Sequence, residues 1–228
     1  SPKICRCLAP GAEVDSSLGL NPLEYYKIFT REVPIEQGYC LLPDGIGFSA
    51  VSIDMPGTTG EMQEWWHPWI TEDDLHYKIW LPGLHVSHHP IREDLGWGLS
   101  FFEPVGRNNP SAVDYEKYGL SAPPSVLEPQ LWSHDCSSAI VRSCDTSEIT
   151  AYITLAHHLV QTDNGFQMRL YAWMGAHLVD GEVRRMLPRG EKVDIEKVRL
   201  FACHNAWEFT RCASLMARIY DFCVVSNA

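Results

Sequence analysis

The C-terminal segment, residues 194–222, constrains the fold more than any other part of the chain. It contains neither proline nor glycine, the two residues that most often interrupt a helix. Its apolar side chains recur at helical spacing, and they are Val198, Phe201, Ala202, Trp207, Cys212, Leu215, Met216, Ile219 and Tyr220. This pattern predicts one long C-terminal helix that packs a broad apolar stripe against the rest of the protein.

Upstream of this helix, several segments alternate between apolar and polar residues, which is typical of half-buried strands. These segments are residues 47–54, 76–80, 96–105, 138–142, 148–159 and 165–173. The turn residues at 162–165 favour a hairpin between the last two strands. Residues 59–70 instead have helical spacing, and Thr59 can cap that helix. A largely antiparallel sheet followed by one long helix is an α+β pattern.

The size of the chain predicts one large domain. Its 228 residues, 45% of them hydrophobic, are enough to bury a sizeable core. We expect a single catalytic domain over residues 1–228, with residues 1–45 as an irregular lead-in. The eight cysteines are scattered through a chain that needs no disulfide scaffold, so we expect reduced thiols.

The charge and hydropathy patterns exclude several classes of partner. A net charge of −11 argues against nucleic acid, because phosphate binding needs clustered Lys and Arg side chains. No apolar run approaches the roughly 20 residues that a membrane span needs, and the first residues lack the pattern of a signal peptide. We therefore expect a cytoplasmic protein that binds a small molecule, with neither nucleic acid nor a membrane as partner, and we allow for a homodimer.

His204 and Glu208 provide the sharpest local chemical signal. Four residues along a helix turn the chain by about 400°, so both side chains project from nearly the same face. An imidazole nitrogen and a carboxylate oxygen are suitable ligands for zinc. The same spacing also occurs in ordinary polar pairs on solvated helix faces, so the spacing alone leaves both interpretations open.

Other polar side chains occur where strands end or inside apolar strands. His85 and His88 follow a predicted strand, where histidines are either metal ligands or exposed loop residues. Glu103 interrupts an apolar strand, so it either faces outward or is buried beside a charge or a metal. Of His157 and His158, one must face inward if their strand is half buried.

Five motifs in a fixed order carry a resemblance to a known family. They are EMQEWWHPW, HYKIWLPGLH, FFEPVG, HHLVQTDNGFQMRLYAW and HNAWE, between residue 61 and residue 208. With them the chain resembles the zinc-dependent diacetylphloroglucinol hydrolases, which cleave a carbon–carbon bond to an acetyl group on a phenolic polyketide. The resemblance implies a helix-grip fold of the START or pollen-allergen type. In that fold a curved antiparallel sheet closes around a cavity against a long C-terminal helix.

The resemblance also implies a metal site. The family's Zn²⁺ ligands, two His and two Glu, fall on His85, Glu103, His204 and Glu208. The loop between His85 and Glu103 is shorter here than in the family enzyme, so Glu116 is the alternative to Glu103 as the second ligand.

Residues that contact substrate follow from the same resemblance. Tyr77, His157 and Tyr171 match a tyrosine, a histidine and a tyrosine of the family that contact substrate. We assign all three a catalytic role and both tyrosines a role in substrate binding as well. His88 stands at a substrate-binding position where the family enzyme has Asn.

Together these features predict a zinc-dependent hydrolase that cleaves a carbon–carbon bond of an acylated phenol, a polyketide or a β-diketone in a retro-Claisen reaction. Zinc would polarise the acyl oxygen or activate water, while Tyr77, His157 and Tyr171 would protonate the ring carbon and hold the phenol oxygens. Two alternatives stay open: another polyketide-tailoring reaction in the same pocket, such as a retro-aldol, lyase or cyclase step, and a non-catalytic carrier of an apolar ligand. Stoichiometric zinc would favour the enzyme.

Overall fold

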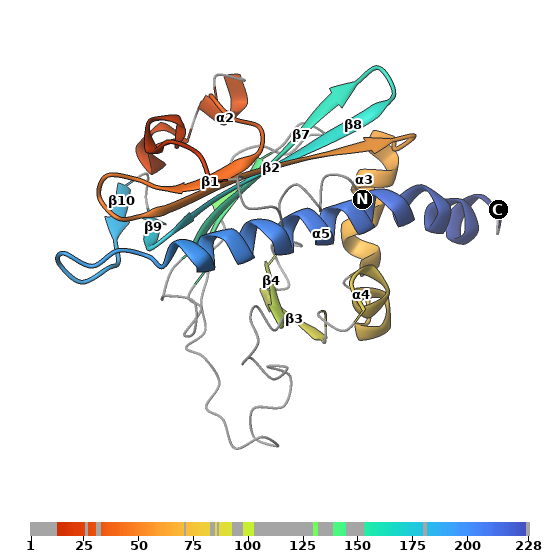
Figure 1. The fold of residues 1–228 in the computed structure, drawn as a ribbon. Helices are drawn as coiled ribbons and strands as arrows, with labels where there is room; N and C mark the ends of the chain where they lie inside the picture. Colours follow the sequence, from red (N-terminus) through yellow and green to blue (C-terminus); the bar gives the residue numbers. More distant parts are fainter. Residues whose placement is uncertain are drawn as a thin grey trace.

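A six-stranded antiparallel sheet and one long helix dominate the computed structural model (Figure 1). The structure describes residues 13–25, 27–30, 33–70, 72–82, 85, 87–92, 98–102, 130–131, 139–144, 153–179 and 182–226. The strands are, in sheet order, β1 (Gly38–Leu41), β2 (Gly47–Pro56), β8 (Gly165–Met174), β7 (Ile153–Thr162), β6 (Ala139–Cys144) and β5 (Gln130–Leu131). The α+β class is confirmed, whereas closure of the sheet around a helix-grip cavity stays a prediction.

The β7–β8 hairpin sets the register of the central strands. Thr162 pairs with Gly165, and the pairing continues without a shift to Ile153 and Met174. Gly165 has a φ of 138°, and a Cβ at this position would meet the carbonyl oxygen of Met55 at 2.5 Å. Glycine is therefore required where the hairpin turn passes close to β2. The regular register places alternate residues of each strand on opposite faces of the sheet.

The two faces of the sheet bury different sets of side chains. One face packs against helix α5 (Ile195–Tyr220), which lies across the sheet in Figure 1. Its core contains Val51, Ile53, Met168 and Leu170 from the strands and Ala202, Ala206, Phe209 and Met216 from the helix. The opposite face packs against the N-terminal segment, with Leu20, Ile28, Phe48, Ala50, Tyr171 and Trp173 in its core.

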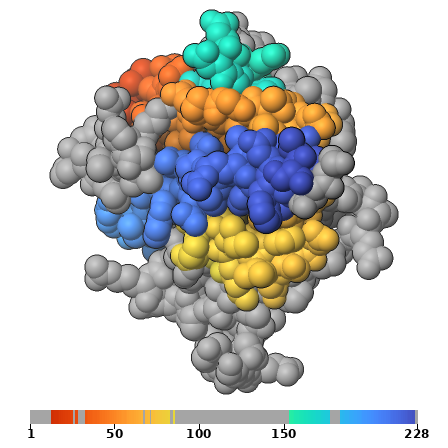
Figure 2. Space-filling view, turned by 90° about the vertical axis from the view of Figure 1, so that its right-hand side faces the viewer, coloured from red at the N-terminus to blue at the C-terminus, as the bar shows by residue number. Residues whose placement is uncertain are grey.

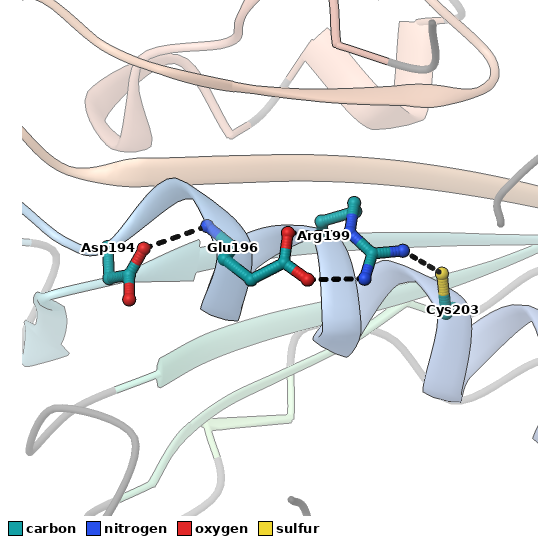
Figure 3. A network of polar contacts seen from close by, with 4 residues as sticks. All are labelled: Asp194, Glu196, Arg199 and Cys203. Carbon is teal, nitrogen blue, oxygen red and sulfur yellow. Dashed lines mark hydrogen bonds and ion pairs between the residues drawn. The ribbon is translucent and has the colours of Figure 1, made fainter. Parts of the chain in front are cut away.

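The long C-terminal helix confirms the prediction for residues 194–222. Asp194 caps α5 by accepting a hydrogen bond from the backbone N–H of Glu196 at 3.0 Å. Figure 3 shows the next turn, where Arg199 pairs with Glu196 and reaches Cys203 Sγ at 4.0 Å. A π-helical turn, η5 (Asp221–Val225), follows the last residue of α5.

One member of the predicted apolar stripe faces solvent. Trp207 is 46% exposed, whereas Phe201, Ala202 and Cys212 are buried. The predicted stripe was too broad, because the part of a helix that contacts one sheet covers only about a third of its circumference.

Two shorter helices, α3 (Gly60–Ile70) and α4 (Asp74–Trp80), follow β2 and pack against α5. Helix α3 follows its predicted cap, because Thr59 Oγ1 accepts from the N–H of Met62 at 3.2 Å. Helix α4 replaces the strand that the alternation at 76–80 predicted. Asp73 caps α4 by accepting from the N–H of His76 at 2.8 Å. The strand prediction was wrong because a segment of only five alternating residues also fits a helix. The buried residues of α4, Tyr77 and Trp80, are three positions apart and therefore lie on one helix face.

The remaining elements are short. They are η1 (Ser16–Leu18), η2 (Pro22–Glu24), α2 (Lys27–Thr30), the hairpin of β3 (Ser87–Arg92) with β4 (Gly98–Phe102), and the hairpin of β9 (Ala176–Val179) with β10 (Glu182–Arg185). The lead-in expected to be irregular over residues 1–45 thus contributes β1 and three helical turns. Trp173 Nε1 donates to the carbonyl of Leu20 at 2.7 Å, which ties this segment to the sheet.

Within the part of the chain that the structure describes, no helix combines the length and the apolar character that a membrane span requires.

Candidate functional site

Three of the four predicted ligands come together where α5 meets the segment that follows α4. Glu208 Oε1 lies 3.4 Å from His85 Nε2, and Glu208 Oε2 lies 3.6 Å from His204 Nε2. The exposed fractions of the three side chains are 0% for His85 and 9% for His204 and Glu208. The carboxylate of Glu208 therefore lies between two imidazole rings in a site from which water is largely excluded. We call these three residues the His–Glu–His cluster.

The tautomer of His85 follows from its second nitrogen. His85 Nδ1 lies 3.0 Å from the backbone carbonyl of Tyr77, and because a carbonyl oxygen only accepts, Nδ1 carries the proton. In a neutral ring Nε2 is then an acceptor, and it faces another acceptor, Glu208 Oε1. A proton or a metal ion between the two atoms would satisfy both of them.

The spacing in the cluster fits a metal ion. A charge-assisted N–H···O bond is usually about 2.7–2.9 Å long, which is shorter than the 3.4 and 3.6 Å found here. Two ligand atoms at 2.0–2.2 Å from a tetrahedral zinc are about 3.4 Å apart. The bond from His85 Nδ1 to a backbone carbonyl is also the outer contact that metal-ligating histidines usually make. Each of the two pairwise spacings is therefore compatible with a zinc ion between the paired atoms.

The His–Glu–His cluster consists of two pairs that share Glu208, and it is not a complete metal centre. In the described part of the chain, no group of three His, Cys, Asp or Glu side chains is arranged to hold a metal ion by itself. Glu103 and its alternative Glu116 lie outside the described residues. His88 lies in β3, where the structure describes the backbone only. The second Glu ligand and the role of His88 stay predictions.

Aromatic side chains from α4 surround His85. Tyr77 is completely buried, and its ring stacks on the His85 ring with centroids 3.9 Å apart and an interplanar angle of 9°. Trp80 meets the His85 ring edge-on at 4.7 Å, and its Nε1 donates to the backbone carbonyl of Glu208 at 3.1 Å. Tyr77 thus lies next to the cluster, on a helix rather than on the predicted strand.

His157 lies on the same face of the sheet as α5. It pairs with Leu170, a member of the core beneath the helix. Its half-buried ring meets Phe209 edge-on at 5.3 Å, and Phe209 in turn meets Trp80 at 5.6 Å. One phenyl ring and one indole thus separate His157 from His85.

Tyr171 lies on the opposite face of the sheet. Because His157 pairs with Leu170, the next residue of β8 points to the other face. There Tyr171 packs with Ala50 and Trp173. Burial raises the pKa of Tyr171, while the nearby guanidinium of Arg169 lowers it. The structure does not bring Tyr171 to the His–Glu–His cluster, and its predicted catalytic role has no support from this position.

Several residues beside the cluster were not singled out by the sequence. Trp80 and Phe209 form the aromatic contacts described above, and Arg211 Nη2 donates to the carbonyl of Ile79 at 3.3 Å. Cys212, one turn after Glu208, is fully buried, and this burial, with the adjacent carboxylate, raises its pKa well above the usual value. The three-residue spacing of Tyr77 and Trp80 was the available signal, but it is recognisable only once α4 is known to be a helix.

Comparisons with known proteins identify the family of this chain. The family described as the DAPG hydrolase PhiG domain matches residues 27–221. The chain is also similar to the phloretin hydrolase of Eubacterium ramulus, with 24% identity over 209 residues that cover 80% of this chain and 70% of that protein. Since the family match spans most of the chain and includes both α4 and α5, this chain belongs to the DAPG hydrolase PhiG domain family.

Proposed function

We propose that this protein is a zinc-dependent hydrolase that cleaves the carbon–carbon bond between an acyl group and a phenolic ring. The observation that carries the proposal is the Glu208 carboxylate between the Nε2 atoms of His85 and His204. Membership of the DAPG hydrolase family and similarity to a phloretin hydrolase support the substrate class, since both names refer to acylated phenols.

The metal would be held by His85, His204 and Glu208, with Glu103 or Glu116 as the fourth ligand. When bound, zinc supplies Lewis acidity for the acyl oxygen and a lower pKa for water. The protein residues supply orientation: the Tyr77 carbonyl fixes the His85 tautomer, and the buried aromatic rings keep the site poor in water.

The reaction is a hydrolysis of the retro-Claisen type. The oxygen of water bonds to the acyl carbon, and the bond from that carbon to the ring breaks. The electron pair of the broken bond goes to the ring carbon, which is protonated, so that the products are a carboxylic acid and the deacylated phenol. A phenol ring makes this leaving group feasible, because its keto tautomer accepts the electron pair.

His157 is the group we assign to the ring proton. It is half buried, lies on the face that carries α5, and contacts Phe209, whose ring in turn contacts Trp80 beside His85. A histidine has a pKa suited to giving and taking a proton near neutral pH. Tyr77, beside His85, is assigned to a phenol or acyl oxygen of the substrate.

The test is product analysis on a panel of acylated phenols that includes phloretin and diacetylphloroglucinol, performed in ¹⁸O-labelled water. We expect the deacylated phenol and a carboxylic acid that carries the label, with activity lost on chelation and restored by zinc. A retro-aldol or lyase reaction would leave the acid unlabelled or give no acid at all.

Two variants of α5 accompany this test. Glu208→Gln keeps the shape of the side chain but removes its charge, and it should abolish activity. Trp207→Phe changes the exposed neighbour of Glu208 and should retain activity. Labelled acid from the Glu208→Gln protein at the wild-type rate would exclude the His–Glu–His cluster as the active site.

A further inference from the structure

We propose that Trp80 is a positioning residue that holds Glu208 opposite His85, with Arg211 as its second support; the inference rests on the proposed metal-dependent function. Trp80 contacts both sides of the cluster. Its indole N–H reaches the Glu208 backbone, and its ring packs against the His85 ring.

The hydrogen bond from Trp80 is additional to the helical pattern. It runs from Nε1 to the Glu208 carbonyl oxygen over 3.1 Å. That oxygen lies in the middle of α5, where regular helical geometry already lets it accept from the backbone N–H of residue 212. The indole is therefore not needed to satisfy the carbonyl, and its effect is to hold the backbone of Glu208 against the last residue of α4.

A second bond joins the same two helices in the opposite direction. Arg211 Nη2 donates to the carbonyl of Ile79, the residue before Trp80, at 3.3 Å. The last carbonyls of a helix lack intrahelical partners, so the guanidinium also caps α4. Figure 2 shows the yellow segment that contains α4 lying directly against the blue C-terminal helix.

The end of α4 also determines where His85 lies. The Tyr77 carbonyl accepts from His85 Nδ1, and the Leu81 carbonyl accepts from the backbone N–H of His85 at 2.9 Å. His85 is therefore attached to α4, whereas Glu208 belongs to α5. The bonds from Trp80 and Arg211 join the two helices in addition to their shared core. They therefore help to set the separation between His85 Nε2 and Glu208 Oε1.

Trp66 offers a matched control. It is 1% exposed, belongs to the same core, and meets Trp80 edge-on at 6.1 Å. Its Nε1 makes no hydrogen bond to any residue that the structure describes. Trp66→Phe and Trp80→Phe therefore remove the same ring volume from one core, but only Trp80→Phe also removes the bond to Glu208.

The first measurement is the zinc dissociation constant of each full-length variant, by competition with a chromophoric chelator. We expect Trp80→Phe to weaken zinc binding by about 10–100-fold, the usual effect of losing an outer contact of a ligand. Trp66→Phe should stay within about threefold of the wild type, since it leaves the ligands' contacts intact. Equal losses in the two variants would overturn the proposal.

The second measurement needs no metal. In the zinc-free protein at fixed pH, the ¹⁵N chemical shift of His85 Nε2 depends on how close the Glu208 carboxylate lies. Glu208→Gln removes the charge of this group, so its change in chemical shift gives the full size of the carboxylate's effect. Trp80→Phe should reproduce much of the Glu208→Gln change, and Trp66→Phe should not. If the wild type binds no zinc, the zinc-dependent function fails, while this shift still decides whether Trp80 positions Glu208.

A second variant covers the case in which Trp80→Phe does not fold. Arg211→Met removes the other bond between α4 and α5 without touching His85 or the Glu208 side chain. It should change zinc affinity and the His85 shift in the same direction as Trp80→Phe. An Arg211→Met protein with wild-type values for both would contradict the proposed positioning.

Discussion

His85 and Tyr77 are linked twice, once through the backbone and once through their rings. His85 Nδ1 donates to the Tyr77 carbonyl at 3.0 Å, and the two rings stack with centroids 3.9 Å apart. The Tyr77 backbone oxygen thus fixes the imidazole so that Nε2 faces Glu208. A substitution that removes only the Tyr77 hydroxyl leaves both links in place, so it separates metal binding from substrate chemistry.

The Tyr77 hydroxyl can be tested against that of Tyr171. We expect Tyr77→Phe to keep zinc and fold while kcat/KM falls by about 10²-fold, the typical effect of a lost proton donor. Tyr171→Phe should stay within about threefold of the wild type, because Tyr171 lies on the face away from α5. Zinc analysis and steady-state kinetics measure both variants. A large loss in Tyr171→Phe with a normal Tyr77→Phe would reverse the two assignments.

Metal content tests the His–Glu–His cluster directly. We expect about one zinc per chain in the wild type, and His204→Ala should lose most of it because one of four ligands is missing. Mass spectrometry of metals in the purified protein measures this. Trp207→Ala, on the exposed side of the same helix, is the control and should keep its zinc. A His204→Ala protein with full zinc content would place the metal elsewhere.

Acid should inactivate the enzyme through the same histidines. Protons compete with zinc for imidazole nitrogens, so kcat/KM should fall as the pH drops below about 6. Added zinc should shift the acid limb to lower pH, because metal and proton compete for the same atoms. Circular dichroism at each pH separates this effect from unfolding. A rate that stays flat down to about pH 4.5 would argue against histidine ligation.

The local features of the fold were predictable because their signals lie within one segment. The Thr59 cap, the proline-free C-terminal helix and the turn at Gly165 each follow from residues close in sequence. The spacing of His204 and Glu208 is also a local feature, because both residues lie on one helix. These parts of the prediction depended on no contact between distant segments.

The parts that failed depend on register and on tertiary contacts. The alternation at residues 76–80 is too short to separate a strand from a helix, and the Asp73 cap decides in favour of α4. The sequence could not place Tyr171 on one face of the sheet, because only the observed pairing of His157 with Leu170 determines which β8 residues share the face of His157. The contact of Trp80 with Glu208 joins residues 128 positions apart, and no local pattern predicts it.

Alkaline stability should depend on Cys40. Burial, with smaller contributions from the charges of Asp15 and Glu13, raises the pKa of the Cys40 thiol from 9.0 to about 11. The folded state holds this proton more tightly than the unfolded state. The resulting stabilisation is complete below pH 9.0 and is lost as the pH rises toward about 11. Urea unfolding at a series of pH values should show this decline.

Cys40→Ala tests this linkage. At neutral pH the variant should lose about 1 kcal/mol from the smaller side chain, but its stability should decline less steeply above pH 9.0 than that of the wild type. An unchanged slope would assign the alkaline decline to other groups, of which Cys203 and Cys212 also have raised pKa values through burial.

The last prediction separates His157 from its neighbour His158. The two residues point to opposite faces of β7, since His157 pairs with Leu170 beneath α5 and His158 pairs with Arg169. His158 is 7% exposed, whereas His157 is half buried beside Phe209. Adjacent histidines of one strand therefore give a matched pair, one facing the proposed substrate and one packed on the far side.

We expect His157→Ala to lower kcat/KM by about 10²-fold or more, as for a lost acid–base group, with normal zinc content and Tm. His158→Ala should lower the Tm, since it leaves a cavity in a buried layer, while the folded fraction keeps near-normal kcat/KM. Kinetics are normalised to folded protein for both variants. If His157→Ala instead lowers the Tm and leaves kcat/KM unchanged, His157 is a core residue, and the ring proton must come from another group near the His–Glu–His cluster.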